Sequence, residues 1–312
     1  MGSERVPYDE FSFFGENAAE FGIAYDADAA PVVRREFVEV GGGRSLSGLV
    51  WGDEPEVVLV HGGAQNAHTW DTVALALDRP LLALDLPGHG HSGPPANGPA
   101  DVHRNAEDIA AVISTLAPNA SMLVGMSLGG LTSSAVVNIH PDRFDALLLV
   151  DITPGVQREK AGHIAAFVNG PTSFESFDEL LARTMEFNPT RSESSLRRGI
   201  LHNAEQLDDG SWVWRHAKSR VFAGSTDSSE PDRAGDAGDY GALWDALVGH
   251  QGRLALARGL RPQSVVTDEE VAELLRLRPD ARVENFAEAG HSIQGDMPIE
   301  LAALISNMLE GA

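Results

Sequence analysis

The chain has 312 residues, of which 43% are hydrophobic, enough to bury the core of one large domain with an insertion or of two modest domains. Its 23 Lys and Arg against 46 Asp and Glu give a net charge of −23, which argues against nucleic acids and anionic lipid surfaces as partners. No cysteine is present, which excludes disulfides, thiolate metal sites and a cysteine nucleophile. No apolar run nears 18 residues and no signal peptide is visible, so we expect a cytoplasmic protein without a membrane span.

The N-terminal part predicts a short helix and then two antiparallel strands. Residues 1–30 mix aromatic side chains with acids and alanines, in keeping with a helix that packs across the main body. Residues 32–40 and 45–51 flank a turn of three glycines, which is typical of neighbouring antiparallel strands.

The middle of the chain predicts a doubly wound, mostly parallel α/β sheet. Short, continuous apolar runs occupy residues 57–60, 81–84, 122–124 and 146–150. Such runs are typical of strands buried on both faces. Helix-like stretches at 70–77, 103–116 and 128–140 separate them, and strand–helix alternation favours parallel pairing.

The alternation stops after Asp151 and resumes about a hundred residues later. Residues 154–245 contain amphipathic pieces, whereas strand- and helix-like segments return at 254–257, 268–277, 282–286 and 299–309. We therefore predict a core of residues 1–153 and 246–312, with a mainly helical cap at 154–245 inserted after the sixth core strand. A loosely ordered insert is the alternative, at least for the polar residues 224–241.

A nucleophile is predicted where a buried strand meets a helix. Gly125-Met126-Ser127-Leu128-Gly129 follows the apolar run and precedes a helix-compatible stretch. This strand–turn–helix pattern is typical of a nucleophile elbow, in which a strained turn lifts the serine hydroxyl clear of the sheet. The flanking glycines avoid collisions with the neighbouring strand and helix. Ser127 is the predicted nucleophile.

The serine needs a histidine to take its proton and an acid to orient that histidine. His291 lies in the loop after the last predicted strand, which opens at the same sheet edge as the elbow. For the acid we favour Asp151, because a carboxylate at the end of a buried strand needs a partner. The alternatives are Asp268, Glu269 and Glu270, at the start of a predicted helix.

Backbone N–H groups should stabilise the oxyanion of an acyl-transfer reaction. We expect them from Leu128 and from Gly63, in a loop that His61 orients. A further set of side chains is predicted to line the substrate pocket: Gln65, Asn66, Trp70, Met126, Trp212 and Trp214. The two last tryptophans could equally form the cap's own core.

No metal site is predicted. Asp85, His89 and His91 share a loop, but its glycines and proline indicate a tight turn, and no third ligand of suitable spacing is near. No cofactor is expected either.

Together, these motifs resemble the α/β-hydrolase fold over residues 32–312. The resemblance rests on His61-Gly62-Gly63, Asp85 to Gly90, the elbow at 125–129 and Ala289-Gly290-His291. In this family the acid usually follows the seventh strand, and no acid occurs at 259–264. An acid at Asp151 is similar to the arrangement in zearalenone-type lactone hydrolases and a minority of esterases.

The sequence therefore predicts a cofactor-free serine hydrolase that cleaves a small apolar ester or lactone through an acyl-enzyme. Carbon–carbon hydrolysis of a dienoate and thioester cleavage are the alternatives on the same three residues. A non-catalytic binding protein is the third hypothesis. A homodimer is left open.

Overall fold

A computed structural model describes residues 5–96, 101–217 and 240–311. Most of the polar stretch 224–241, and with it part of the predicted cap, lies outside these residues. The helices and strands, in chain order, are α1 (Phe14–Phe21), η1 (Ala27–Ala29), β1 (Val33–Gly41), β2 (Arg44–Trp51), β3 (Val57–Val60), η2 (Ala67–Trp70), α2 (Asp71–Leu77), β4 (Leu81–Leu84), α3 (Val102–Leu116), β5 (Met122–Met126), α4 (Leu128–Ile139), β6 (Ala146–Val150), α5 (Arg158–Val168), β7 (Ser173–Phe174), α6 (Phe177–Phe187), α7 (Glu193–Asn203), β8 (Ala204–Gln206), β9 (Trp212–Trp214), η3 (Arg215–Ala217), α9 (Gly241–Gly249), β10 (Arg253–Gly259), α10 (Asp268–Leu277), β11 (Arg282–Phe286), α11 (Ile293–Asp296) and α12 (Pro298–Leu309).

An eight-stranded sheet forms the centre, in the order β1-β2-β4-β3-β5-β6-β10-β11. The first two strands pair antiparallel, β2 also pairs antiparallel with β4, and the remaining pairs are parallel. The predicted antiparallel start and parallel continuation are therefore both confirmed. Because the strands from β3 onward run the same way, their carboxyl ends share one edge, where the catalytic residues are expected.

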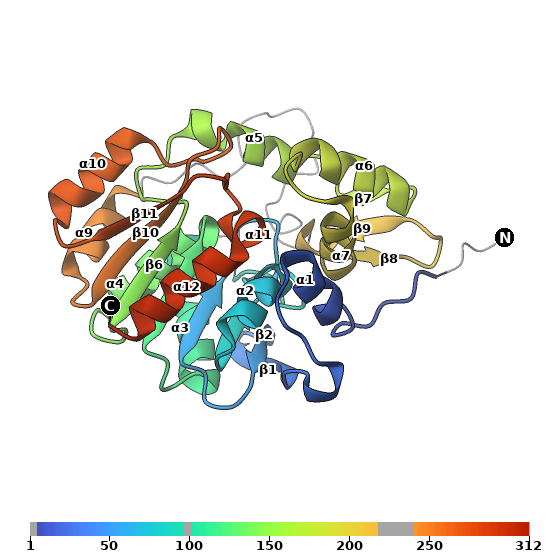
Figure 1. Ribbon diagram of the computed structural model, residues 1–312, viewed down its shortest axis with the longest axis horizontal. Coiled ribbons are helices and arrows are strands. Elements are labelled where there is room, and N and C mark those ends of the chain that lie inside the picture. Colours follow the sequence, from blue (N-terminus) through green and yellow to red (C-terminus); the bar gives the residue numbers. More distant parts are fainter. Residues whose placement is uncertain (1–4, 97–100, 218–239, 312) are drawn as a thin grey trace.

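Both faces of this sheet are covered by helices (Figure 1). Alternate residues of each strand enter opposite cores. Val58 belongs to the cluster that includes residues of α3, α4 and α9, whereas Leu59 belongs to the cluster that includes residues of α1, α2 and α12. Burial on both faces explains why the strands are apolar runs without alternation. The predicted N-terminal helix is α1, whose Phe14 is buried against Trp51.

Between β6 and β10 the chain leaves the sheet and builds a separate layer (Figure 1). Helices α5, α6 and α7 accompany a three-stranded antiparallel sheet, β7-β9-β8, which the sequence analysis did not predict. These strands have only two or three residues, too few for a periodic pattern to be recognised. The layer has its own apolar cluster, which includes Trp212 and Trp214. The limits of the predicted cap remain a prediction.

Candidate active site

Ser127 occupies the sharp turn between β5 and α4. Its backbone has φ 52° and ψ −121°, a conformation that is strained for any residue other than glycine. The Ser127 N–H donates to the carbonyl of Val150 in the neighbouring strand, at 3.2 Å. This strained, anchored turn has the form of the predicted elbow.

Glycines make the tight turn sterically feasible. A Cβ atom on Gly125 would lie 2.4 Å from the carbonyl oxygen of Gly129, and one on Gly129 would lie 2.3 Å from that of Val60. Both separations are too short for real atoms, so β3, β5 and α4 can meet here only if these positions lack side chains.

Asp151 and His291 meet at the end of β6, 140 positions apart in the chain. His291 Nδ1 lies 2.9 Å from Asp151 Oδ2. Because an ionised carboxylate only accepts, Nδ1 carries the hydrogen, and Nε2 of a neutral ring is left with its lone pair. That Nε2 is buried and has no hydrogen-bond partner among the described residues.

The Asp151 carboxylate is fully buried and is held by further donors. Oδ1 accepts from the Gly259 N–H at 2.9 Å and from the Ser264 hydroxyl at 2.6 Å, and Oδ2 accepts from the Val265 N–H at 3.0 Å. These contacts compensate for the loss of hydration on burial and fix the carboxylate beside the imidazole.

The three alternative acids lie elsewhere, and none bonds to His291 in the described part of the chain. Asp268 is 88% exposed and pairs with Arg258. Glu269 is exposed at the start of α10. Glu270 caps that helix reciprocally with Thr267.

The loop after β3 lies directly beside the elbow. A Cβ on Gly62 would lie 2.5 Å from Met126 Sδ and 3.2 Å from Ser127 Cβ, so a side chain here would require Met126 to shift. A Cβ on Gly63 would lie 4.0 Å from Leu128 Cδ2, which makes the two predicted oxyanion donors neighbours. Neither of their N–H groups donates to a protein acceptor among the described residues.

His61 fixes the loop after β3 through contacts with backbone groups. Its fully buried ring contacts the Gly62 carbonyl through Nδ1 at 2.7 Å, and its Nε2 accepts from the Leu86 N–H at 2.9 Å. Burial lowers the pKa of His61 to about 3, and the nearby His89 contributes in the same direction. The ring is therefore neutral and joins the loops after β3 and β4, the orienting role that the sequence predicts.

A cavity of about 470 Å³ opens above these residues, and both Ser127 and His291 line it. Its walls come from the core loops and from the layer between β6 and β10, including α5 and α7. Apolar side chains from that layer line the cavity: Ile164, Phe167, Val168, Phe187, Leu196, Ile200 and Trp214. The cavity can therefore take a substrate of apolar character.

The model of the "Alpha/beta hydrolase family" matches residues 57–304. The chain belongs to this family. The match spans most of the chain and confirms both the predicted resemblance and the predicted fold.

Among curated relatives of this alpha/beta hydrolase, "Esterase Rv0045c" of Mycobacterium tuberculosis is 38% identical over 98% of each chain. A solved structure of that esterase, whose title concerns its transition metal inhibition, superimposes with a TM-score of 0.82 and covers 98% of this chain and 100% of its own. The "2-(acetamidomethylene)succinate hydrolase" of Mesorhizobium japonicum is 27% identical, over 83% of this chain and 89% of its own.

Four of the six predicted substrate residues line the cavity of this alpha/beta hydrolase: Gln65, Asn66, Met126 and Trp214. Trp70 and Trp212 are not among the residues that line it. Trp70 is fully buried in the core beneath α2. Trp212 packs edge-on against Phe177 inside the small-sheet layer.

The loop with Asp85 has a structural role. The Asp85 carboxylate accepts from Arg35 at 2.7 Å, Ser47 at 2.5 Å and the Ala67 and His91 N–H groups at 2.8 and 3.0 Å. Although burial alone would raise the pKa of Asp85, the Arg35 guanidinium and these donors hold it well below its usual range. The carboxylate is thus bound by protein donors.

Sequence reasoning missed several polar contacts between the core and the layer that lies between β6 and β10. Asn203, at the end of α7, donates to the Ala64 carbonyl at 2.5 Å, and Asn66 Nδ2 lies 3.3 Å from Asn203 Oδ1. His68, Asp71 and His202 form a buried cluster at the same boundary. No local pattern could pair these residues, because one of each set comes from α7.

Proposed function

We propose that this protein is a cofactor-independent serine hydrolase that cleaves a carboxylic ester, linear or cyclic, through Ser127, His291 and Asp151. The observation that carries the proposal is the contact between Asp151 and His291 beside the cavity that Ser127 lines. That contact holds the imidazole with its Nε2 lone pair available for the serine proton.

Relatives support the reaction class. The chain is a carboxylic ester hydrolase, since a relative that spans 98% of its length is a named esterase. The acyl-enzyme, the three residue roles and the lactone substrate are our proposal, as are a cytoplasmic location and a homodimer. No helix in the described residues is long and apolar enough to cross a bilayer.

In the first half-reaction, His291 Nε2 takes the Ser127 proton while Oγ attacks the ester carbonyl carbon. The N–H groups of Gly63 and Leu128 hold the oxyanion, and each such donor is worth roughly 3–4 kcal/mol to the transition state. The carbon–oxygen bond to the alcohol then breaks, and the proton on Nε2 passes to the leaving alkoxide. An acyl-Ser127 remains.

In the second half-reaction, His291 Nε2 takes a proton from water, and the hydroxide attacks the acyl carbon. The bond to Ser127 Oγ breaks, His291 returns the proton to Oγ, and the acid leaves. A cyclic ester opens by the same steps, with its alcohol still attached to the acyl group.

A panel of esters, thioesters and macrocyclic lactones tests the proposal, with products identified by intact mass. We expect ester cleavage that is lost in Ser127→Ala, on the order of 10⁶-fold in kcat. A lactone substrate gains one water without fragmenting. Thioester or dienoate cleavage without ester cleavage would contradict the proposal, as would full activity in Ser127→Ala with a native circular dichroism spectrum.

A further inference from the structure

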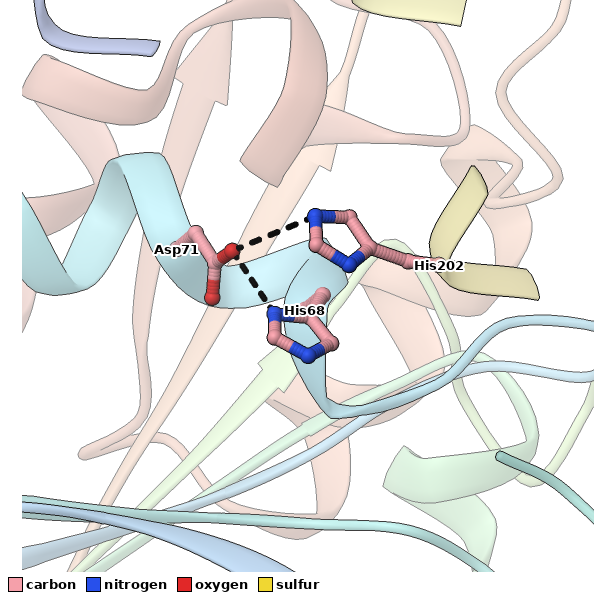
Figure 2. A group of neighbouring side chains, drawn as sticks. All are labelled: His68, Asp71 and His202. Carbon is pink, nitrogen blue, oxygen red and sulfur yellow. Dashed lines mark hydrogen bonds and ion pairs between the residues drawn. The ribbon is translucent and has the colours of Figure 1, made fainter. Parts of the chain in front are cut away.

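Two imidazoles and a carboxylate that the proposed hydrolysis does not use lie at the boundary between core and cap. Figure 2 shows His68 and Asp71, from η2 and the start of α2, facing His202 from α7. All three side chains are buried, with 2%, 2% and 4% of their surface exposed. From this cluster we propose a divalent transition-metal site, with Zn²⁺ as the ion that fits its ligands.

The three ligand atoms converge on one point. His68 Nδ1 lies 2.9 Å from Asp71 Oδ2, and His202 Nε2 lies 3.9 Å from the same oxygen. One possible ligand atom from each of the three residues lies within 4.8 Å of the other two. Two nitrogens and one carboxylate oxygen form a ligand set that Zn²⁺ binds, with bonds of about 2.0–2.2 Å.

Two atoms of the cluster lack hydrogen-bond partners. His202 Nε2 and Asp71 Oδ1 are buried, and neither has a partner among the described residues. An unsatisfied buried polar atom costs about 1–3 kcal/mol. A cation between the three side chains would bond to Nε2 and to the Asp71 carboxylate, and so would use this unsatisfied capacity.

In each histidine, the remote ring nitrogen, which points away from Asp71, contacts a polar group, as in metal sites. His68 Nε2 lies 3.0 Å from Glu10 Oε1, and His202 Nδ1 lies 2.8 Å from the Tyr8 hydroxyl. A ligating histidine almost always uses its other nitrogen in this way, because the contact fixes the tautomer and the ring. With a hydrogen on each remote nitrogen, and with the hydrogen between His68 Nδ1 and Asp71 released on binding, the lone pairs of His68 Nδ1 and His202 Nε2 would face the ion.

The charges around the cluster favour a divalent cation. Glu10, Asp71 and Asp85 supply three carboxylates. The nearby guanidiniums are those of Arg35, which pairs with Glu10 and Asp85, and of Arg198, which pairs with Glu20. Zn²⁺ would displace the hydrogen between His68 Nδ1 and Asp71 Oδ2 and release it as a proton. The imidazoles now stack at 3.8 Å with 11° between their planes, and they must tilt for both to bond to one ion.

An ion can reach the site from the substrate cavity, since His68 and His202 both line it. Three protein ligands leave a fourth position of a tetrahedral ion open. Because one ligand comes from the cap and two come from the core, bound Zn²⁺ would hold α7 against η2.

Zn²⁺ titration of the untagged, chelator-treated full chain tests the site by calorimetry. We expect one equivalent to bind. His202→Phe keeps a ring against Tyr8 and Phe13, and Asp71→Asn keeps the side-chain shape, but each removes a ligand. Each should weaken binding by more than about 100-fold, and Glu10→Gln by roughly 10–100-fold.

Two histidines that line the same cavity serve as controls. His163→Gln should leave the Zn²⁺ affinity unchanged, because this ring lies outside the cluster. His291→Gln separates the proposed site from zinc bound beside Ser127. Zinc binding that survives in His202→Phe, or that is lost in either control, overturns the proposal.

Crystals of the wild-type protein also test the zinc site, and this experiment does not depend on whether the variants fold. Anomalous scattering at the zinc edge from crystals grown with one equivalent should peak between His68, Asp71 and His202. No stoichiometric binding, or a peak only elsewhere, would mean that the cluster is a metal-free contact between cap and core.

Discussion

At the scale of single residues, Asp151 combines a strained backbone with a carboxylate whose two oxygens both accept hydrogen bonds. Its φ of 48° lies in the left-handed region, which a non-glycine residue adopts at a cost of about 1–3 kcal/mol. This turn directs the side chain to the Gly259, Ser264 and Val265 donors and to His291. The strain is thus found where the carboxylate must be positioned beside the base.

Asp151→Asn should lower kcat for ester cleavage by about 10⁴-fold, because an amide there favours the wrong imidazole tautomer. Asp268→Asn is the matched control, and we expect less than a twofold change from this exposed residue. Steady-state kinetics of both variants on one ester measures the difference. The reverse pattern would assign the acid to Asp268.

His61 should make stability depend on pH. Its pKa is about 3 in the folded protein and 6.5 when unfolded, so below pH 6.5 the unfolded chain binds a proton that the folded chain does not. Above pH 6.5 this difference in proton binding does not lower the free energy of unfolding. As the pH falls from 6.5 to 3, it lowers that free energy by up to about 1.4 kcal/mol per pH unit.

Urea unfolding of the wild type and of His61→Gln, from pH 7.5 to 5, measures this contribution. The wild type should lose stability more steeply than the variant, although the variant should be less stable at pH 7.5. Parallel curves would show that His61 does not carry the pH dependence.

At the scale of elements, the elbow depends on how closely α4 approaches β3. A Cβ on Gly129 would meet the carbonyl oxygens of Val60 and His61, at 2.3 and 2.5 Å, and backbone atoms of a central strand cannot move aside. The helix that begins at Leu128 is therefore fixed against the sheet at its first turn.

Gly129→Ala should cost more than about 3 kcal/mol of unfolding free energy, or prevent folding. Gly162→Ala, in α5, has nothing within 4 Å of the new Cβ and should stabilise by about 0.5–1 kcal/mol through helix propensity. Chemical denaturation of both variants checks the contrast. Equal effects would show that the close approach is not what requires the glycine.

At the scale of the whole molecule, the net charge of −23 sets the field that an incoming substrate meets. Like charges repel at distances up to the Debye length, about 30 Å at 0.01 M salt and 8 Å at 0.15 M. Anionic esters should therefore be disfavoured at low ionic strength, and neutral esters should be unaffected.

We expect kcat/KM for an anionic ester to rise several-fold between about 0.01 M and 0.3 M NaCl. A neutral ester of the same acyl group should change by less than about twofold. Initial rates of the two substrates across the salt series give the comparison. A fall in kcat/KM for the anion would indicate local positive charge at the cavity that outweighs the global field.

Much of the architecture and of the candidate site follows from local sequence. The strands at 57–60 and 146–150 were predicted with their observed bounds, because full burial leaves an apolar run bounded by polar turns. Ser127 and His291 could be named because an elbow and the loop after the last strand are local features. Asp151 could be proposed because a carboxylate that ends a buried strand needs a partner.

The tertiary structure alone decided what depends on contacts between distant segments. The short strands β7, β8 and β9 exist only as a paired set. Trp212 and Trp214 lie on the same face of β9, yet of the two only Trp214 lines the cavity. His202 reaches Tyr8 across 194 positions and faces Asp71 from another element. Hydrophobic periodicity reports which face of an element is buried but not which partner covers it. The layer between β6 and β10, the cavity and the histidine cluster could therefore be recognised only in the tertiary structure.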